Sequence, residues 1–190
     1  MRTFRLVPLV FAVLLIISVL LNLFQWKLNN EQSDRITNVL GESVASGRGH
    51  LIETMVNLDN AIKGEQTVMS LRETSSNMDA TYRILEPTVH LHPKYSNEWL
   101  EIKKTLFDIS HSQTLRKIEA AYQAEGVLTS EQKDILKQIL FFLTEVRESL
   151  EAPSIRILVG GDPDFYIPSE AIQRAFRAAN TIQEFLQSKQ

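Results

Sequence analysis

The sequence contains no cysteine, and only 7 glycines and 6 prolines among its 190 residues. Without cysteine, a disulfide framework, a cysteine-ligated zinc or iron–sulfur site, a thiol nucleophile and a lipid-modified cysteine are all excluded. The low glycine and proline content, together with 44% apolar residues, excludes collagen-like and low-complexity disordered chains. What remains is a chain long enough for one or two small domains.

Concentrated positive charge is also lacking. The chain has 20 Lys and Arg against 23 Asp and Glu, and no stretch is rich in Lys or Arg. Nucleic acid and anionic lipid headgroups are bound by stripes of positive charge, so neither is expected as a partner.

The motifs of several enzyme classes are missing. There is no G-x-G-x-x-G or G-x-x-x-x-G-K phosphate loop, no G-x-S-x-G nucleophile elbow and no H-E-x-x-H zinc motif. The sequence therefore predicts a protein that is not an enzyme and that carries no cofactor.

One long apolar run lies near the N-terminus. From Leu6 to Trp26 there is no charged side chain. A helix of about 21 residues spans roughly 31 Å, close to the thickness of the hydrocarbon core of a bilayer. A cleaved secretory signal is the alternative, but no pair of small residues follows the run at cleavage spacing. We expect an uncleaved signal anchor over residues 6–26, as the only membrane span.

The flanks of this run predict its orientation. Arg2 and Arg5 precede it with no acidic residue beside them, whereas the far flank carries charges of both signs. A short basic N-terminus usually stays in the cytoplasm. We therefore expect a single-pass protein of the cell membrane, with residues 1–5 cytoplasmic and residues 27–190 extracytoplasmic.

Apolar residues recur at helical spacing along the rest of the chain, which predicts an all-α fold. We expect an antiparallel bundle of four to six helices, counting the membrane helix. Residues 155–159 are compatible with a short strand, for which no partner is evident.

Several local signals predict where the helices begin and end. Pro87 stops a helix at the preceding residue, Ser96 is a candidate N-cap for a helix that starts near Trp99, and Gly126 ends that helix. Thr129 to Gln132 form a capping-box pattern that opens the next helix. A change of apolar phase at residues 111–114 predicts a kink.

Glycines 41, 47 and 49 interrupt an apolar stripe that begins at Ile36. Each glycine weakens a helix by roughly 1 kcal/mol relative to alanine. The segment is a hinge, a close helix–helix contact, or a break between two helices. We favour the break.

The same stripe predicts a surface for a partner. Its near-heptad spacing would allow a coiled coil with another helix, from another membrane or envelope protein or from a second copy. The predicted contact residues are Ile36, Leu40, Val44, Leu51 and Met55.

Residues His90 and His92 are the candidate metal ligands. Alternate residues of an extended segment place both imidazoles on one side, but a site needs at least a third ligand. A metal-dependent hydrolase would use this pair, and a solvated loop with two exposed histidines is the alternative. The acidic pair Asp162 and Asp164 is interpreted as a turn, because a calcium loop needs more oxygen ligands. The apolar trio 165–167 that follows either plugs an end of the bundle or forms a docking spot.

The layout of an N-terminal anchor followed by antiparallel helices resembles the outer sensor modules of bacterial receptors. No functional residue follows from this resemblance. Our main hypothesis is a non-enzymatic, membrane-anchored module that binds another protein or its own copy. The alternative is a ligand-sensing regulatory module, with a small-molecule pocket between helices and the loops at 90–92 and 162–166 as its rim.

Overall fold

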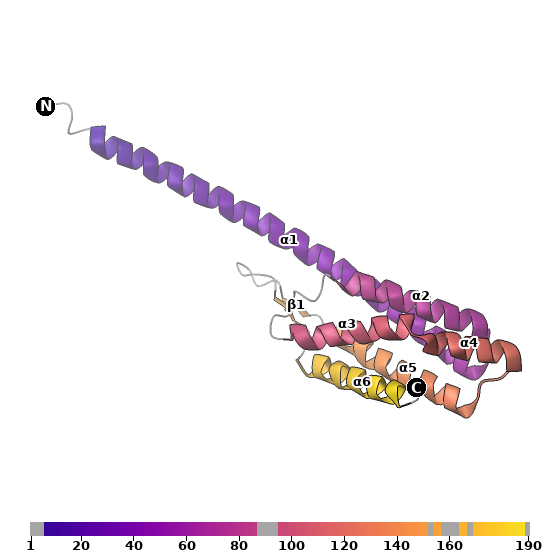
Figure 1. The fold of residues 1–190 in the computed structure, drawn as a ribbon. Helices are drawn as coiled ribbons and strands as arrows, with labels where there is room; N and C mark the ends of the chain where they lie inside the picture. Colours follow the sequence, from indigo (N-terminus) through magenta and orange to yellow (C-terminus); the bar gives the residue numbers. More distant parts are fainter. Residues whose placement is uncertain (1–5, 87–94, 152–153, 157–163, 167–168, 189–190) are drawn as a thin grey trace.

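In the computed structural model the chain forms a helical bundle from which one long helix projects (Figure 1). The structure describes residues 6–86, 95–151, 154–156, 164–166 and 169–188. Within these ranges there are six helices and one short hairpin, so the predicted all-α class is confirmed. In chain order the elements are α1 (Leu6–Lys63), α2 (Thr67–Leu85), α3 (Ser96–His111), α4 (Gln113–Glu125), α5 (Ser130–Glu151), β1 (Ser154–Arg156), β2 (Asp164–Tyr166) and α6 (Ser169–Gln187).

The bundle is a ring of five helices. The C-terminal part of α1 packs against α2 and α5, α2 packs against α3, and α6 closes the ring between α3 and α5. Helix α4 follows α3 after a one-residue break and packs on α2. Such a ring buries one stripe of each helix that forms it, and the C-terminal part of α1 and the helices α2, α3, α5 and α6 carry apolar residues at the helical spacing this requires.

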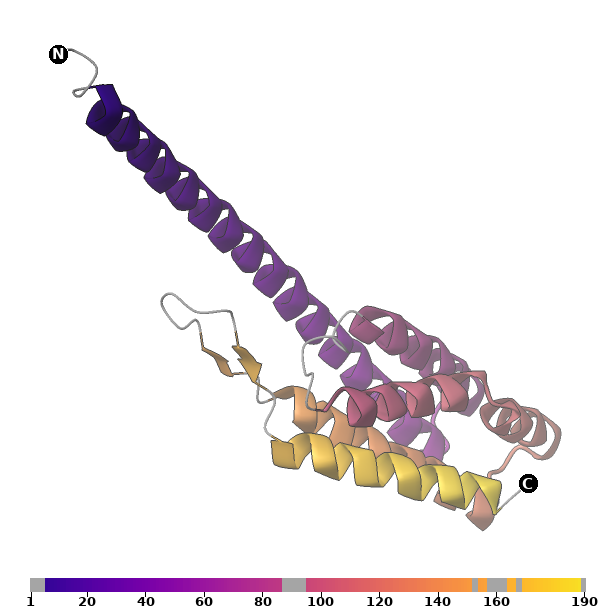
Figure 2. The same cartoon turned by 60° about the vertical axis from the view of Figure 1, so that its left-hand side comes forward.

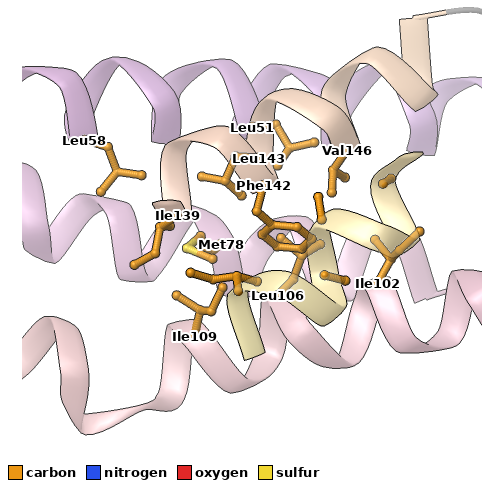
Figure 3. Close-up of a cluster of buried hydrophobic side chains, with 14 of the residues drawn as sticks. Leu51, Leu58, Met78, Ile102, Leu106, Ile109, Ile139, Phe142, Leu143 and Val146 are labelled. Atoms are coloured by element: carbon orange, nitrogen blue, oxygen red, sulfur yellow. The ribbon is translucent and has the colours of Figure 1, made fainter. Parts of the chain in front are cut away.

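The core fills the centre of this ring (Figure 3). Helix α5 contributes the widest buried face, as its broad apolar pattern predicted, and that face meets stripes from the other helices. The labelled core side chains, each no more than 1% exposed, are Leu51, Leu58, Met78, Ile102, Leu106, Ile109, Ile139, Phe142, Leu143 and Val146.

Helix α1 runs unbroken through all three glycines, so the favoured break between two helices is wrong. Gly47 is buried where α1 enters the bundle, and a Cβ built on it would lie 2.9 Å from Leu85 Cδ2 on α2. The glycine therefore serves the close helix–helix contact that was one of the alternatives. No atom lies within 4 Å of a Cβ built on Gly49, so a side chain there would change only the helix propensity.

Most of the predicted helix ends are confirmed. Gly126 takes the left-handed conformation with φ of 72° and donates its N–H to Tyr122 O, which ends α4. The capping box at the start of α5 is present: Thr129 N–H donates to Gln132 Oε1 at 2.9 Å, and Gln132 N–H donates to Thr129 Oγ1 at 3.2 Å. The kink is a break at Ser112, which caps α4.

Two local predictions are wrong. Ser96 is the first residue of α3 and Tyr95 is the N-cap, so the helix starts earlier than expected. The strand near residue 155 does have a partner, because β1 pairs antiparallel with β2 and Ile155 faces Phe165. Phe165 and Tyr166 therefore belong to a strand and not to a loop. Each strand has only three residues, and paired residues lie at least eight positions apart in the sequence, so the pairing leaves no local signal.

Candidate functional site

The N-terminal part of α1 projects far beyond the bundle, and no other helix runs beside it in either view (Figures 1 and 2). The large apolar side chains that the structure describes between Phe11 and Leu28 are exposed, from 41% at Leu28 to 68% at Phe11. An exposed apolar surface of this length is exceptional for a protein in water and marks a site of contact with a membrane or a protein. The exposed residues are Phe11, Leu14, Leu15, Ile16, Ile17, Val19, Leu20, Leu21, Leu23, Phe24, Trp26 and Leu28.

Taken over the residues that the structure describes, no helix combines the length and the apolar character needed to cross a membrane. The described side chains of α1 begin at Phe11 and omit positions 12 and 13. The span expected at residues 6–26 therefore stays a prediction.

The predicted partner stripe on α1 divides into two parts. Val44 and Leu51 are buried, at 4% and 0% exposure, and Met55 is half-buried against the same core. These three side chains pack inside the bundle and are not presented to another molecule. The side chains of Ile36 and Leu40, which precede Val44 in α1, are outside the described residues. Periodicity located the apolar stripe, but it could not tell an internal seam from an external one.

The candidate metal ligands His90 and His92 lie outside the described residues, as does Asp162. Among the residues that are described, no group of three or more metal-ligating side chains comes together. The metal prediction stays untested.

A buried lysine at the α2–α3 contact is a feature that the sequence analysis missed. Lys103 is 3% exposed, and its ammonium donates to the carbonyl of Glu86 at 3.4 Å, just past the end of α2. The ammonium also lies 5.2 Å from the centre of the Tyr82 ring, within the range of a cation–π contact. Burial lowers the pKa of Lys103, and the nearby Glu86 carboxylate opposes the shift.

An aromatic and ionic cluster continues along the same contact. The His111 ring stacks on Phe107 at 4.1 Å, and His111 Nε2 is 3.7 Å from Asp79 Oδ1. Asp79 also accepts from Arg83 Nε at 2.9 Å. Paired acidic and basic groups of this kind join two helices. The Ser110 hydroxyl lies 2.8 Å from His111 Nδ1, but Ser110 is buried and its hydroxyl also donates to Phe107 O at 2.8 Å. The only sequence signal was the spacing of four between Asp79 and Arg83.

A cleft of about 790 Å³ lies at the end of the bundle away from the projecting part of α1 (Figure 1). It lies between α4, the start of α5 and the end of α6, with Ile118, Ile135 and Leu186 among its lining residues. Polar and charged side chains of both signs, including Lys117 and Glu131, complete the lining. The cleft is large enough for a small molecule, but it is not the region that the sequence analysis expected to form a rim.

The chain was compared with protein-family models, with curated proteins and with solved structures, and none of them matches it.

Proposed function

We propose that this protein is a non-enzymatic, membrane-anchored module, in which α1 serves as both the anchor and the central support of an extracytoplasmic helical bundle. The observation that carries the proposal is the two-part character of α1. Its N-terminal part exposes a nearly continuous apolar surface, whereas its C-terminal part is buried in the core. A bilayer would remove the exposed apolar surface from water.

The single helix also supports a role as a stalk. Val44 is the first side chain of α1 that the structure describes as buried. Between Trp26, where the uncharged run ends, and Val44, α1 rises about 27 Å at 1.5 Å per residue. The bundle would therefore stand clear of the headgroups and be accessible to proteins near the membrane.

Alkaline carbonate washing of membranes from cells that express the full chain tests the anchor. We expect the wild-type chain to stay in the pellet and the double variant Ile16→Lys/Ile17→Lys to be released. Two lysines at the centre of a span oppose insertion by about 5–7 kcal/mol. The matched control is Val39→Lys, at another exposed apolar position of α1 that lies outside the run. Release of the wild-type chain by carbonate would refute the anchor.

Orientation is tested separately with a C-terminal epitope tag in cells stripped of any outer barrier. Added protease should remove the tag from intact cells, because the proposal places the bundle outside. Protection of the tag until the membrane is permeabilised would reverse the orientation.

A ligand-sensing role is the second candidate, and the cleft of about 790 Å³ between α4, α5 and α6 is the observation that favours it. Thermal unfolding of the detergent-solubilised full chain with small metabolites tests this role. A ligand-dependent rise in melting temperature that is lost in Ile135→Trp, which fills the cleft, would support it. A rise that persists in that variant would place the ligand elsewhere.

A further inference from the structure

The polar residues of the apolar run lie on one face of α1. Between Leu6 and Trp26 the only side chains with hydrogen-bonding groups other than the indole of Trp26 are Ser18, Asn22 and Gln25. They are spaced by four and three residues, which places them in one line along a helix. The line continues beyond the run at Asn29 and Gln32 with the same alternation. We call these five residues the amide stripe.

The amide stripe lacks partners within the chain. All five side chains are exposed, and among the described residues none of them forms a hydrogen bond with another group. No other helix runs beside this part of α1 in either view (Figures 1 and 2). If residues 6–26 cross a bilayer, the three stripe residues within that range, Ser18, Asn22 and Gln25, lie in the membrane. An unpaired polar group is strongly unfavourable in hydrocarbon.

Water at the membrane interface can satisfy the hydrogen-bonding groups of only part of the stripe. Gln25 is next to Trp26 and its long side chain extends to the interface. Asn22 and Ser18 lie about 6 and 12 Å deeper in the membrane than Trp26, measured along the helix, and have short side chains. The Ser18 hydroxyl can donate to a carbonyl one turn earlier in its own helix, whereas the Asn22 amide needs a hydrogen-bonding partner inside the membrane.

We propose that the partner is a second copy of this chain, which pairs in parallel through the amide stripe. This inference rests on the membrane anchor proposed above. Two copies in one membrane share an orientation, so a two-fold axis along the bilayer normal places each stripe residue opposite itself. An amide carries both a donor and an acceptor, so Asn22 of one copy satisfies Asn22 of the other.

The residues around the stripe fit this pairing. Spacings of three and four are those of the seam of a left-handed coiled coil, and asparagine in such a seam specifies register and oligomeric state. At 100° per residue the charged Lys27, Glu31 and Asp34 lie on the opposite side of α1. Like charges are therefore kept apart when two copies meet.

Cysteine crosslinking in native membranes tests the pairing, because the chain has no cysteine of its own. The test pair is Asn29→Cys and Asn30→Cys, which replace neighbouring exposed residues of the same type on and off the stripe. A disulfide requires Cα atoms within about 7 Å, a distance available only in the seam. Under mild oxidation we expect at least fivefold more crosslinked dimer for Asn29→Cys, and mixed tagged and untagged copies to appear in one product.

The variant Asn22→Leu/Gln25→Leu in the Asn29→Cys background separates pairing from anchoring. Leucine keeps the helix apolar, so the chain should stay in the carbonate-washed pellet while its crosslinking falls about tenfold. Equal crosslinking of the two cysteine variants, an unchanged yield in the leucine variant, or an adduct with a different protein would overturn the pairing and leave the anchor intact. Release of the cysteine variants and the wild-type chain by carbonate would overturn both.

Discussion

The contact between Gly47 and Leu85 gives the sharpest test of the fold. In Gly47→Ala the new methyl group would lie 2.9 Å from Leu85 Cδ2 and 3.1 Å from Leu85 Cγ, and Leu85 is fully buried. Replacing a glycine within a helix contributes about 1 kcal/mol of propensity, whereas overpacking a core costs about 1–3 kcal/mol. We expect the free energy of unfolding to fall by about 0–2 kcal/mol, the difference between these two effects.

Gly49→Ala is the matched control, because nothing lies within 4 Å of its Cβ position. It should stabilise α1 by about 1 kcal/mol. Urea unfolding of the full chain in mild detergent, followed by far-UV circular dichroism, measures both variants. In a Leu85→Ala background, which removes the clash, Gly47→Ala should become stabilising as well. The reasoning would be refuted if Gly47→Ala stabilised the intact protein as much as Gly49→Ala, or had the same effect in both backgrounds.

Three further predictions use the same unfolding assay. Phe142→Ala empties the centre of the core and should lower the free energy of unfolding by about 3–5 kcal/mol. Phe141→Ala, at the neighbouring side chain that is 53% exposed, should change it by less than about 0.5 kcal/mol. Similar losses in the two variants would disprove the register of α5. Thr129→Ala removes the capping-box oxygen that accepts from Gln132 N–H and should lower the free energy of unfolding by about 1 kcal/mol. Thr129→Ser keeps that oxygen and should retain most of this stability. Equal losses in the two variants would argue against the cap. Because burial lowers the pKa of Lys103 from 10.5, the unfolded state binds more protons in the pH range below that value, so the free energy of unfolding should rise as the pH approaches 10.5. Lys103→Met keeps the aliphatic stem and should abolish Lys103's part of this rise, and an unaltered pH profile would contradict the lowered pKa.

The helix boundaries show how far local signals reach. Helix α2 ends at Leu85, two residues before Pro87, as the sequence predicted. Proline, Gly126 and the capping box at Thr129 act through the backbone of a few neighbouring residues, so these helix ends were predictable. The break predicted at Gly47 was wrong because helix propensity is a weak preference that packing overrides. The residue that packs closely on Gly47 is Leu85 on another helix, and no pattern near Gly47 encodes that contact.

Among the candidate sites, too, those that depend on one helix were predictable and those that depend on a second helix were not. The apolar run from Leu6 to Trp26 and the amide stripe are properties of one helix, since a helix fixes which residues share a face. The stripe through Val44, Leu51 and Met55 was visible for the same reason, yet its partner proved to be the chain's own core. The buried Lys103 and the cluster at His111 could not be found, because their neighbours come from a second helix.

The sequence by itself determined the helical class, most helix ends and the uncharged segment at the N-terminus, because these depend on spacing and on local backbone chemistry. Only the tertiary structure decided that α1 is one unbroken rod, which of its faces is internal, and that β1 and β2 pair. Those outcomes depend on contacts between residues far apart in the chain, and such contacts are set by how the helices close into a ring around a shared core.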